Sequence, residues 1–206
     1  MADAEIPVPP AETSEELTPA EKAAIGERRR SRVRNLILLL KDPNLNFRWH
    51  AAEMLGQEHD AEAVGPLIDA LKDPYVDVQW LAAKSLGDIG DPRAFGPLMD
   101  ASSSGDKWLR AGAAYGLGKL RDLRGVDRLL ALLRDTKRQV RKEAAAALGS
   151  IADPRAEPGL TETLKDPDAG VREAAGKALA MVRAKAGSGQ EAPQKVLPPD
   201  LTPSSP

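Results

Sequence analysis

A unit of 31 residues recurs five times along this chain with no insertion between the copies. The copies begin at Arg34, Gly65, Gly96, Asp127 and Pro158. A unit of this length cannot bury its apolar residues alone, so it gains a continuous core only by stacking on its neighbours. The repeat therefore predicts an elongated stack of similar units.

Apolar residues stand at fixed positions of the unit, counted from the five starting residues. Leucine occupies positions 3 and 22, and alanine position 18, in every copy. Positions 14, 18 and 22 are four residues apart, the spacing of one helix face, so all three are predicted to face the core. Position 14 holds Phe47, Val78, Leu109, Val140 and Val171. Position 3 lies on a second, shorter helix with position 7, which holds Leu40, Leu71, Leu133 and Leu164.

Turn signals separate the two helices of each unit. The segment "DPR" at Asp91 and Asp153 offers an Asp N-cap followed by Pro at the first helical position, and Asp60 and Asp122 hold the same position. The segment "KDP" is predicted to end the first helix, because the residue before Pro disfavours the helical conformation. Each unit is thus predicted to be a helix, a tight turn, a second helix and a capped turn.

The segment "LKDPYVDVQWLAAKSLGDIGDPRA", which starts at Leu71, resembles the short HEAT-like repeat first named from phycocyanobilin lyases. The resemblance covers residues 34–183. It implies an all-α fold, a right-handed α-solenoid of five HEAT-like helix pairs. It implies little about function, because such repeats serve bilin lyases, scaffold proteins and a few enzymes.

The flanking segments differ from the repeats. Residues 1–17 are rich in Pro and Glu and are expected to be a disordered arm. The capping box "TPAE" at Thr18–Glu21 predicts an N-terminal capping helix that continues into the first repeat. The repeat domain is expected to span 18–183, and residues 184–206, rich in Gly, Pro and Ser, to be a disordered tail.

Four aromatic residues share one side of the second helices. An advance of about 100° per residue places Trp49, Trp80, Trp108 and Tyr115 opposite the core face. We call these four residues the aromatic row. Under the resemblance, this side lines a concave surface. Because contiguous exposed aromatic residues mark binding surfaces, we predict a partner-binding site formed by Trp49, His50, Asp77, Trp80, Lys84, Trp108 and Tyr115. The alternatives are that the terminal arms or long Lys and Arg side chains cover the rings, or that the rings have no role.

Arginine recurs at position 15, on the border of the core. The row consists of Arg48, Arg110, Arg141 and Arg172, with Gln79 interrupting it. Because the guanidinium fork matches carboxylates, we interpret the row as structural, pairing with Asp residues of neighbouring turns such as Asp42, Asp73 and Asp135. The basic run "ERRRSRVR" at 27–34 is interpreted as a solvated helix face.

The sequence favours a non-catalytic scaffold or adaptor that binds a protein or peptide in the concave groove. It contains no known catalytic or nucleotide-binding motif, no Cys and no His-Glu pair, so no catalytic residue, cofactor or metal site is predicted. If the protein is an enzyme, the alternative is a phycobilin lyase or lyase-like chaperone, with a bilin chromophore as ligand. A HEAT-like DNA glycosylase is disfavoured because a DNA-binding groove should be basic, whereas the exposed positions here mix acidic residues such as Glu53 and Asp77 with basic ones such as Lys84. With no signal peptide and no apolar run long enough to cross a membrane, we expect a cytoplasmic protein.

Overall fold

The structure, a computed structural model, describes residues 18–188. These residues form ten α-helices, four one-turn 3-10 helices and no strand. The α-helices are α1 (Pro19–Leu39), α2 (Leu45–Glu58), α3 (Val64–Ala70), α4 (Val76–Ile89), α5 (Phe95–Ala101), α6 (Lys107–Leu120), α7 (Val126–Leu132), α8 (Arg138–Ile151), α9 (Glu157–Thr163) and α10 (Ala169–Ser188). None of the helices within 18–188 is long and apolar enough to cross a membrane.

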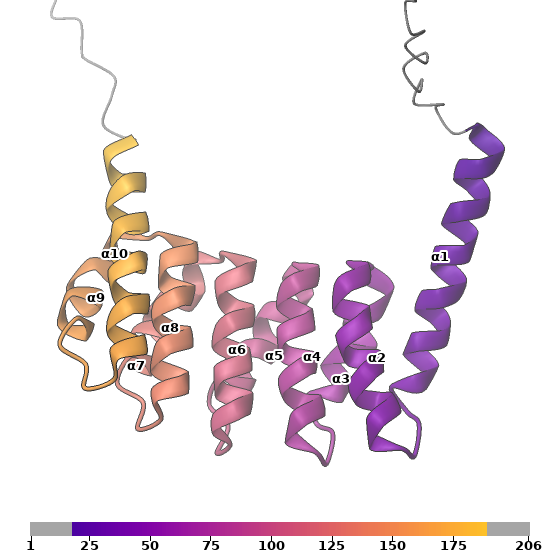
Figure 1. Cartoon of the computed structure of the whole chain (residues 1–206), viewed down its shortest axis with the longest axis horizontal. Coiled ribbons are helices and arrows are strands. Elements are labelled where there is room, and N and C mark those ends of the chain that lie inside the picture. Colours follow the sequence, from indigo (N-terminus) through magenta and orange to yellow (C-terminus); the bar gives the residue numbers. More distant parts are fainter. Residues whose placement is uncertain (1–17, 189–206) are drawn as a thin grey trace, which may run out of the picture.

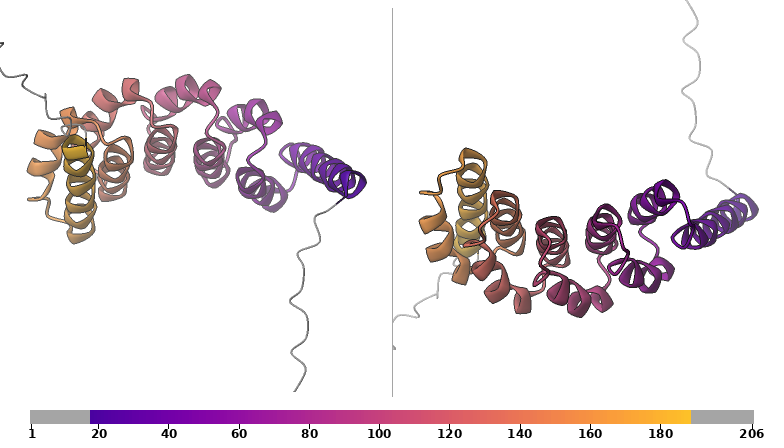
Figure 2. Two further views of the ribbon diagram at one scale, coloured as in Figure 1. Left: turned by 90° about the horizontal axis from the view of Figure 1, so that it is seen from above. Right: turned by 90° about the horizontal axis from the view of Figure 1, so that it is seen from below.

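The helices form two parallel rows, which confirms the predicted all-α solenoid. The long helices α2, α4, α6, α8 and α10 lie side by side, with the short helices α3, α5, α7 and α9 behind them (Figure 1). The rows bend into an arc, and the long helices lie on its inner side (Figure 2). We call the surface of this inner row the inner face.

The predicted core positions are buried in the central repeats. Every alanine at position 18 and every leucine at position 3 is less than a tenth exposed. Phe47, at a position predicted to face the core, is instead 50% exposed, and Leu164 at position 7 of the last repeat is 39% exposed. Phe47 lies in the first repeat and Leu164 in the last, so within residues 18–188 each has a full repeat on one side only. The prediction that position 14 faces the core was therefore wrong at Phe47.

Side-chain caps mark the start of α1 and of the four 3-10 turns. The Thr18 side chain accepts from the Glu21 N–H, and Glu21 returns the contact, so the predicted capping box begins α1. The Asp residues predicted to cap the first helix of each unit instead cap a 3-10 turn directly before it. These turns are Ala61–Ala63, Pro92–Ala94, Leu123–Gly125 and Pro154–Ala156.

The two ends of the chain lie partly outside the described residues. Residues 1–17 and 189–206, predicted to be disordered, are among those not described. The predicted boundary at residue 183 differs from the structure, because α10 continues to Ser188. The segment Ala184–Ala186 contains strong helix formers and no proline, so nothing stops the helix there.

Glycine sets the spacing within the inner row. Position 23 is glycine in four repeats, and each faces position 21 of the next repeat. The pairs are Gly56 with Ser85, Gly87 with Gly116, Gly118 with Ala147, and Gly149 with Ala178. A Cβ atom on Gly87 would lie 2.5 Å from the Gly116 Cα atom, closer than any real contact. Adjacent long helices therefore touch backbone to backbone at these points.

Candidate protein-binding face

All members of the aromatic row lie on the inner row of helices. Trp49 is on α2, Trp80 on α4, and Trp108 and Tyr115 are on α6. The side chains of Trp49 and Trp108 are each 39% exposed, whereas Trp80 and Tyr115 are half-buried. The predicted residues His50 and Asp77 are exposed, and Lys84 is half-buried.

A groove of about 480 Å³ lies between α2 and α4 and continues towards α6. Trp49, Trp80 and Leu81 supply its apolar surface, and Glu53, Gln57 and Lys84 are among its polar residues. We call it the Trp49–Trp80 groove. A groove that combines indole rings with a few polar groups has the composition of a recognition site.

Trp80 is more covered than its helical position predicts. A Cβ atom added to Gly112 would lie 2.9 Å from the Trp80 Cδ1 atom. The indole therefore lies directly against the backbone of α6. A projection of α4 alone does not include its neighbour α6. Because Gly112 has no side chain, α6 can approach α4 closely. Trp80 therefore packs against the core as well as lining the groove.

Tyr115 is the centre of a polar cluster between α4 and α6. Its hydroxyl donates to an Asp88 carboxylate oxygen at 2.7 Å. Lys84 and Lys119 approach the same carboxylate at 3.2 and 3.6 Å. Burial, followed by the hydrogen bond to Asp88, raises the pKa of the Tyr115 hydroxyl, so it stays protonated. Asp88 and Lys119 are not among the predicted site residues, although both stand at exposed positions in the repeat.

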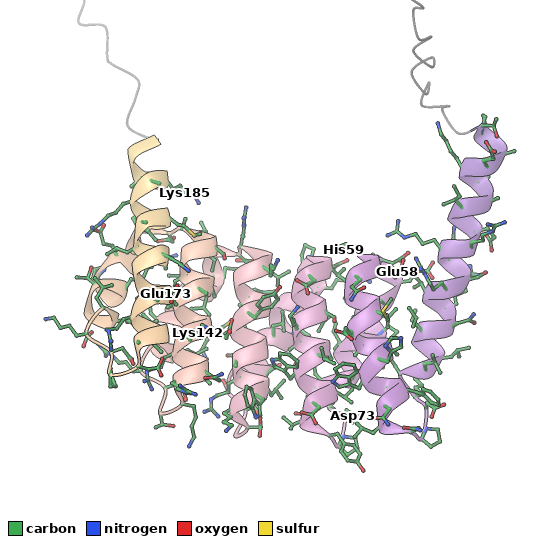
Figure 3. All side chains as sticks on the ribbon, in the orientation of Figure 1. Glu58, His59, Asp73, Lys142, Glu173 and Lys185 are labelled. Atoms are coloured by element: carbon green, nitrogen blue, oxygen red, sulfur yellow. The ribbon has the colours of Figure 1, made fainter. Side chains whose placement is uncertain are left out.

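The opposite end of the inner face carries no aromatic ring. Figure 3 shows Lys142 on α8 and Glu173 on α10 at this end. Lys177 pairs with Glu173 at 2.6 Å on the same helix, so the charge of Glu173 is satisfied locally. The predicted difference between an aromatic half and a small or polar half is present in the structure.

The family profile of HEAT repeats matches residues 33–117 and 96–180, which together are most of the chain. The chain belongs to the HEAT repeat family.

Solved structures with similar folds agree with this assignment. The complex of CpcE and CpcF of phycocyanin lyase from Nostoc sp. PCC7120 is 26% identical, with a TM-score of 0.65, over 90% of this chain and 73% of that one. A designed armadillo repeat protein in complex with peptide (KR)4 is 19% identical, with a TM-score of 0.56, over 71% and 80% of the two chains. An engineered protein is 24% identical, with a TM-score of 0.57, over 80% and 84%. The latter two likenesses show the fold alone. No curated protein matched the chain.

The Arg row connects consecutive HEAT repeats. Three of its four Arg residues pair with the Asp in the turn of the following repeat, at nitrogen–oxygen distances of 2.6 to 2.8 Å. The pairs are Arg48 with Asp73, Arg110 with Asp135, and Arg141 with Asp166. Arg141 donates two hydrogen bonds to Asp166, and this interaction lowers the pKa of the Asp166 carboxyl. Arg172 has no following repeat and donates to two carbonyl oxygens of its own turn.

One of the expected Arg–Asp pairs is absent, because both of its residues are replaced. Gln79 takes the Arg position on α4, and Ser104 takes the Asp position in the turn that would face it. The Gln79 amide still donates to the Asp73 carbonyl oxygen, and the Ser104 hydroxyl still accepts from the Asp106 N–H. The local turns are therefore kept, while the ion pair between the second and third HEAT repeats is lost.

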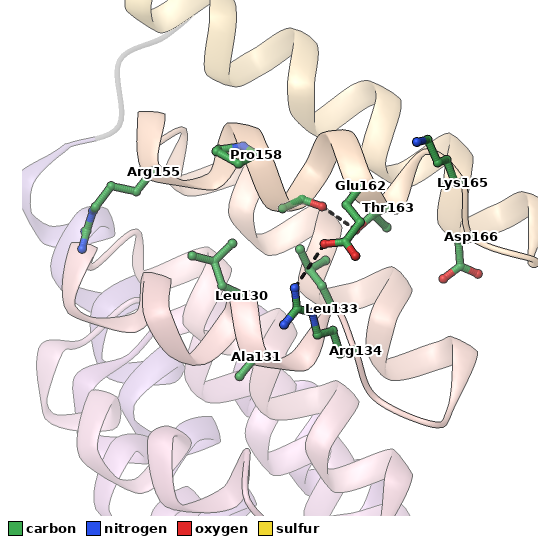
Figure 4. A pocket seen from close by; sticks show the side chains of 11 residues that line it. Leu130, Ala131, Leu133, Arg134, Arg155, Pro158, Glu162, Thr163, Lys165 and Asp166 are labelled. Atoms are coloured by element: carbon green, nitrogen blue, oxygen red, sulfur yellow. Dashed lines mark hydrogen bonds and ion pairs between the residues drawn. The ribbon is translucent and has the colours of Figure 1, made fainter.

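The outer side of the HEAT repeats offers a second hollow, of about 690 Å³, between α7 and α9. Figure 4 shows Arg134 and Glu162 paired across it, at 3.2 Å. Both side chains are well exposed, so this contact contributes little to stability. Within residues 18–188, no group of three or more metal-ligating side chains comes together.

Proposed function

We propose that this HEAT repeat protein is a non-catalytic scaffold or adaptor that binds an extended segment of another protein along its inner face. The observation that carries the proposal is the Trp49–Trp80 groove, where two indole rings and Leu81 line one hollow together with polar side chains. Trp is among the residue types that most often anchor interfaces, and its rigid side chain loses little conformational entropy on binding.

The site residues proposed for this function are those of the predicted set. Trp49, Trp80 and Trp108 would supply contact area, and His50, Asp77, Lys84 and Tyr115 would supply polar contacts. None of the three indole N–H groups donates a hydrogen bond to another residue of the described part of the chain. Each therefore remains free to donate to a carbonyl of a bound segment.

An unbiased peptide selection tests the proposal. A random library of linear peptides is selected on the whole protein, and the enriched peptides are titrated by calorimetry. We expect Trp49→Ala to weaken their binding about tenfold or more, the level of an interface anchor. Lys177→Ala, at the aromatic-free end, is the matched control and should leave binding unchanged. Enriched peptides that bind both variants equally well would overturn the proposal.

A second candidate function is a phycobilin lyase or lyase-like chaperone. It is supported by the 26% likeness to the phycocyanin lyase complex, and the aromatic row would contact a tetrapyrrole or its acceptor protein. Titration with a linear tetrapyrrole separates the two candidates. Binding that shifts the pigment's absorbance and is lost in Trp49→Ala would favour this function, and an unchanged spectrum would reject it.

A further inference from the structure

Most aromatic rings of this protein already carry a cation of the same chain. Lys107 lies 5.1 Å from the centre of the Trp108 ring, and Lys84 and Lys119 lie 4.8 and 5.5 Å from that of Tyr115. Outside the aromatic row, Arg48 lies over Tyr75 and Arg124 over Phe95. Covering a ring with a cation is thus the repeated way in which this chain uses its exposed aromatic surface.

Three of the seven aromatic rings have no such cation within residues 18–188, namely Phe47, Trp49 and Trp80. Two of these three, Trp49 and Trp80, line one groove. Indole is the ring type that attracts a cation most strongly. The groove therefore holds two of the three indole rings of the chain, and no cation of residues 18–188 lies over either of them.

The carboxylates beside these rings are also unpaired. Glu53 lines the Trp49–Trp80 groove, and Asp77 lies three residues before Trp80 on α4, which places it on the same helix face. No ion pair or side-chain hydrogen bond within residues 18–188 engages either carboxylate. Asp88, the third acidic group, is already neutralised by Lys84 and Lys119. Two unpaired negative charges thus accompany two rings over which no cation of residues 18–188 lies.

From this arrangement we infer that the Trp49–Trp80 groove takes an extended segment of a partner protein that carries lysine or arginine side chains. The inference rests on the proposed function and names the chemistry of its partner. The aliphatic stem of each basic side chain lies against Trp49 or Trp80, and its charged end meets Glu53 or Asp77. Lys107 on Trp108 shows the same contact made within the chain.

A designed set of peptides tests this inference on the whole protein. The probe is a capped peptide of about ten residues that alternates Lys and Ser, because alternate side chains of an extended chain point to the same side. Two controls replace every Lys by Gln or by Glu. Binding is followed by intrinsic Trp fluorescence and by calorimetry at low and at physiological salt. We expect the Lys peptide to bind about tenfold or more tightly than the Gln peptide, and the Glu peptide not to bind.

Variants then locate the binding. Trp49→Ala and Trp80→Ala should each weaken the Lys peptide by about three- to thirtyfold. Trp49→Phe and Trp80→Phe keep the packing with a weaker ring and should lie between the wild type and the Ala variants. Glu53→Gln should weaken binding about threefold and reduce its dependence on salt. Glu173→Gln is the matched control on α10 and should bind like the wild type.

The outcomes separate this inference from the proposed function. Equal affinity for the Lys and Gln peptides, or Lys-peptide binding that both Trp49→Ala and Trp80→Ala leave unchanged, would overturn the inference. Selected neutral or acidic peptides that depend on Trp49 would keep the proposed function and reject only the basic partner. If no peptide of any charge depends on Trp49, both fail.

Discussion

The first half of the inner face, with α2 and α4, and the second half, with α8 and α10, share the same buried core positions but present different side chains at the surface. Beneath both, position 18 is a fully buried alanine, for example Ala82 in the second repeat and Ala144 in the fourth. Above it, the first half presents Trp49 and Trp80, whereas the second half presents Lys142 and Glu173 at the same position 16 of the repeat. The repeat thus specifies the stack through one set of positions and leaves another set free to specify a surface.

The charges of the two halves differ in the same way. In the second half, Lys177 satisfies Glu173 on the same helix. In the first half, Glu53 and Asp77 have no such partner among the described residues. The two Trp rings without a cation lie in the first half beside these two carboxylates, and a ligand explains a partly exposed surface of this composition better than stability does.

The largest effects should be equal in the two halves, because the core is shared. Leu86 in the first half and Leu148 in the second are both fully buried at position 22. Leu86→Ala and Leu148→Ala should each lower the free energy of unfolding by about 2–5 kcal/mol, measured by urea denaturation. A cost below about 1 kcal/mol at either position would show that the two halves do not share one core.

Glycine contacts should give the next largest effect. In Gly87→Ala the new Cβ atom would meet the Gly116 backbone, and in Gly149→Ala it would meet Ala178, so neither neighbour can move aside cheaply. Each change should cost about 1–3 kcal/mol of unfolding free energy. Gly96→Ala is the control, because a Cβ atom there meets nothing within 4 Å. It should be neutral or stabilising by about 0.4–1 kcal/mol. Equal melting temperatures for all three variants would reject close packing of the inner row.

The missing ion pair gives a smaller effect, confined to the boundary between the second and third repeats. Gln79→Arg alone and Ser104→Asp alone each place an unpaired charge on this partly buried border. Together they should recreate the contact that Arg110 makes with Asp135, with a favourable coupling of about 1 kcal/mol in a double-mutant cycle. A coupling near zero would mean that this boundary has a geometry different from the other three.

The framework could be predicted from sequence because it is periodic. The register at positions 3, 18 and 22 and the capping box at Thr18 follow from spacing and local chemistry, which do not depend on the neighbouring repeats. The exposed Phe47 could not be predicted in this way. Position 14 is buried only in repeats that follow another repeat. Phe47 follows α1 instead, and the repeat pattern alone does not define which residues α1 covers.

The site was predictable in part. The positions of Trp49, Trp80 and Trp108 on one row follow from helix geometry. The contact between Trp80 and Gly112 does not, since it depends on how closely α4 and α6 approach. The glycines at position 23 were the available signal for that approach. The cations over the rings could not be predicted either. Lys107, Lys84 and Lys119 reach their rings through side-chain conformations that sequence spacing does not define.

The smallest expected effect compares two glutamates of the inner face by their response to pH. Glu143 on α8 is half-buried, and no hydrogen bond or ion pair within residues 18–188 reaches its carboxylate. Burial raises its pKa above the ordinary 4.5, and nearby Lys142 and Lys84 only partly oppose this. Glu173 is exposed, and the hydrogen bond from Lys177 lowers its pKa below 4.5.

The two pKa shifts predict that Glu→Gln substitution changes the stability in opposite directions at the two positions. Above the raised pKa of Glu143, the folded state holds a charge that burial disfavours, so Glu143→Gln should be more stable than the wild type at neutral pH. This gain should disappear as the pH falls below about 4.5, where the carboxyl is protonated in both the folded and the unfolded states. Glu173→Gln should instead be slightly less stable at neutral pH, and that loss should disappear as the pH falls through the lowered pKa of Glu173. Urea denaturation of the three proteins between neutral and acidic pH measures both differences. A gain for Glu143→Gln that persists unchanged in acid would come from packing, and would mean that the half-buried charge of Glu143 does not destabilise the fold.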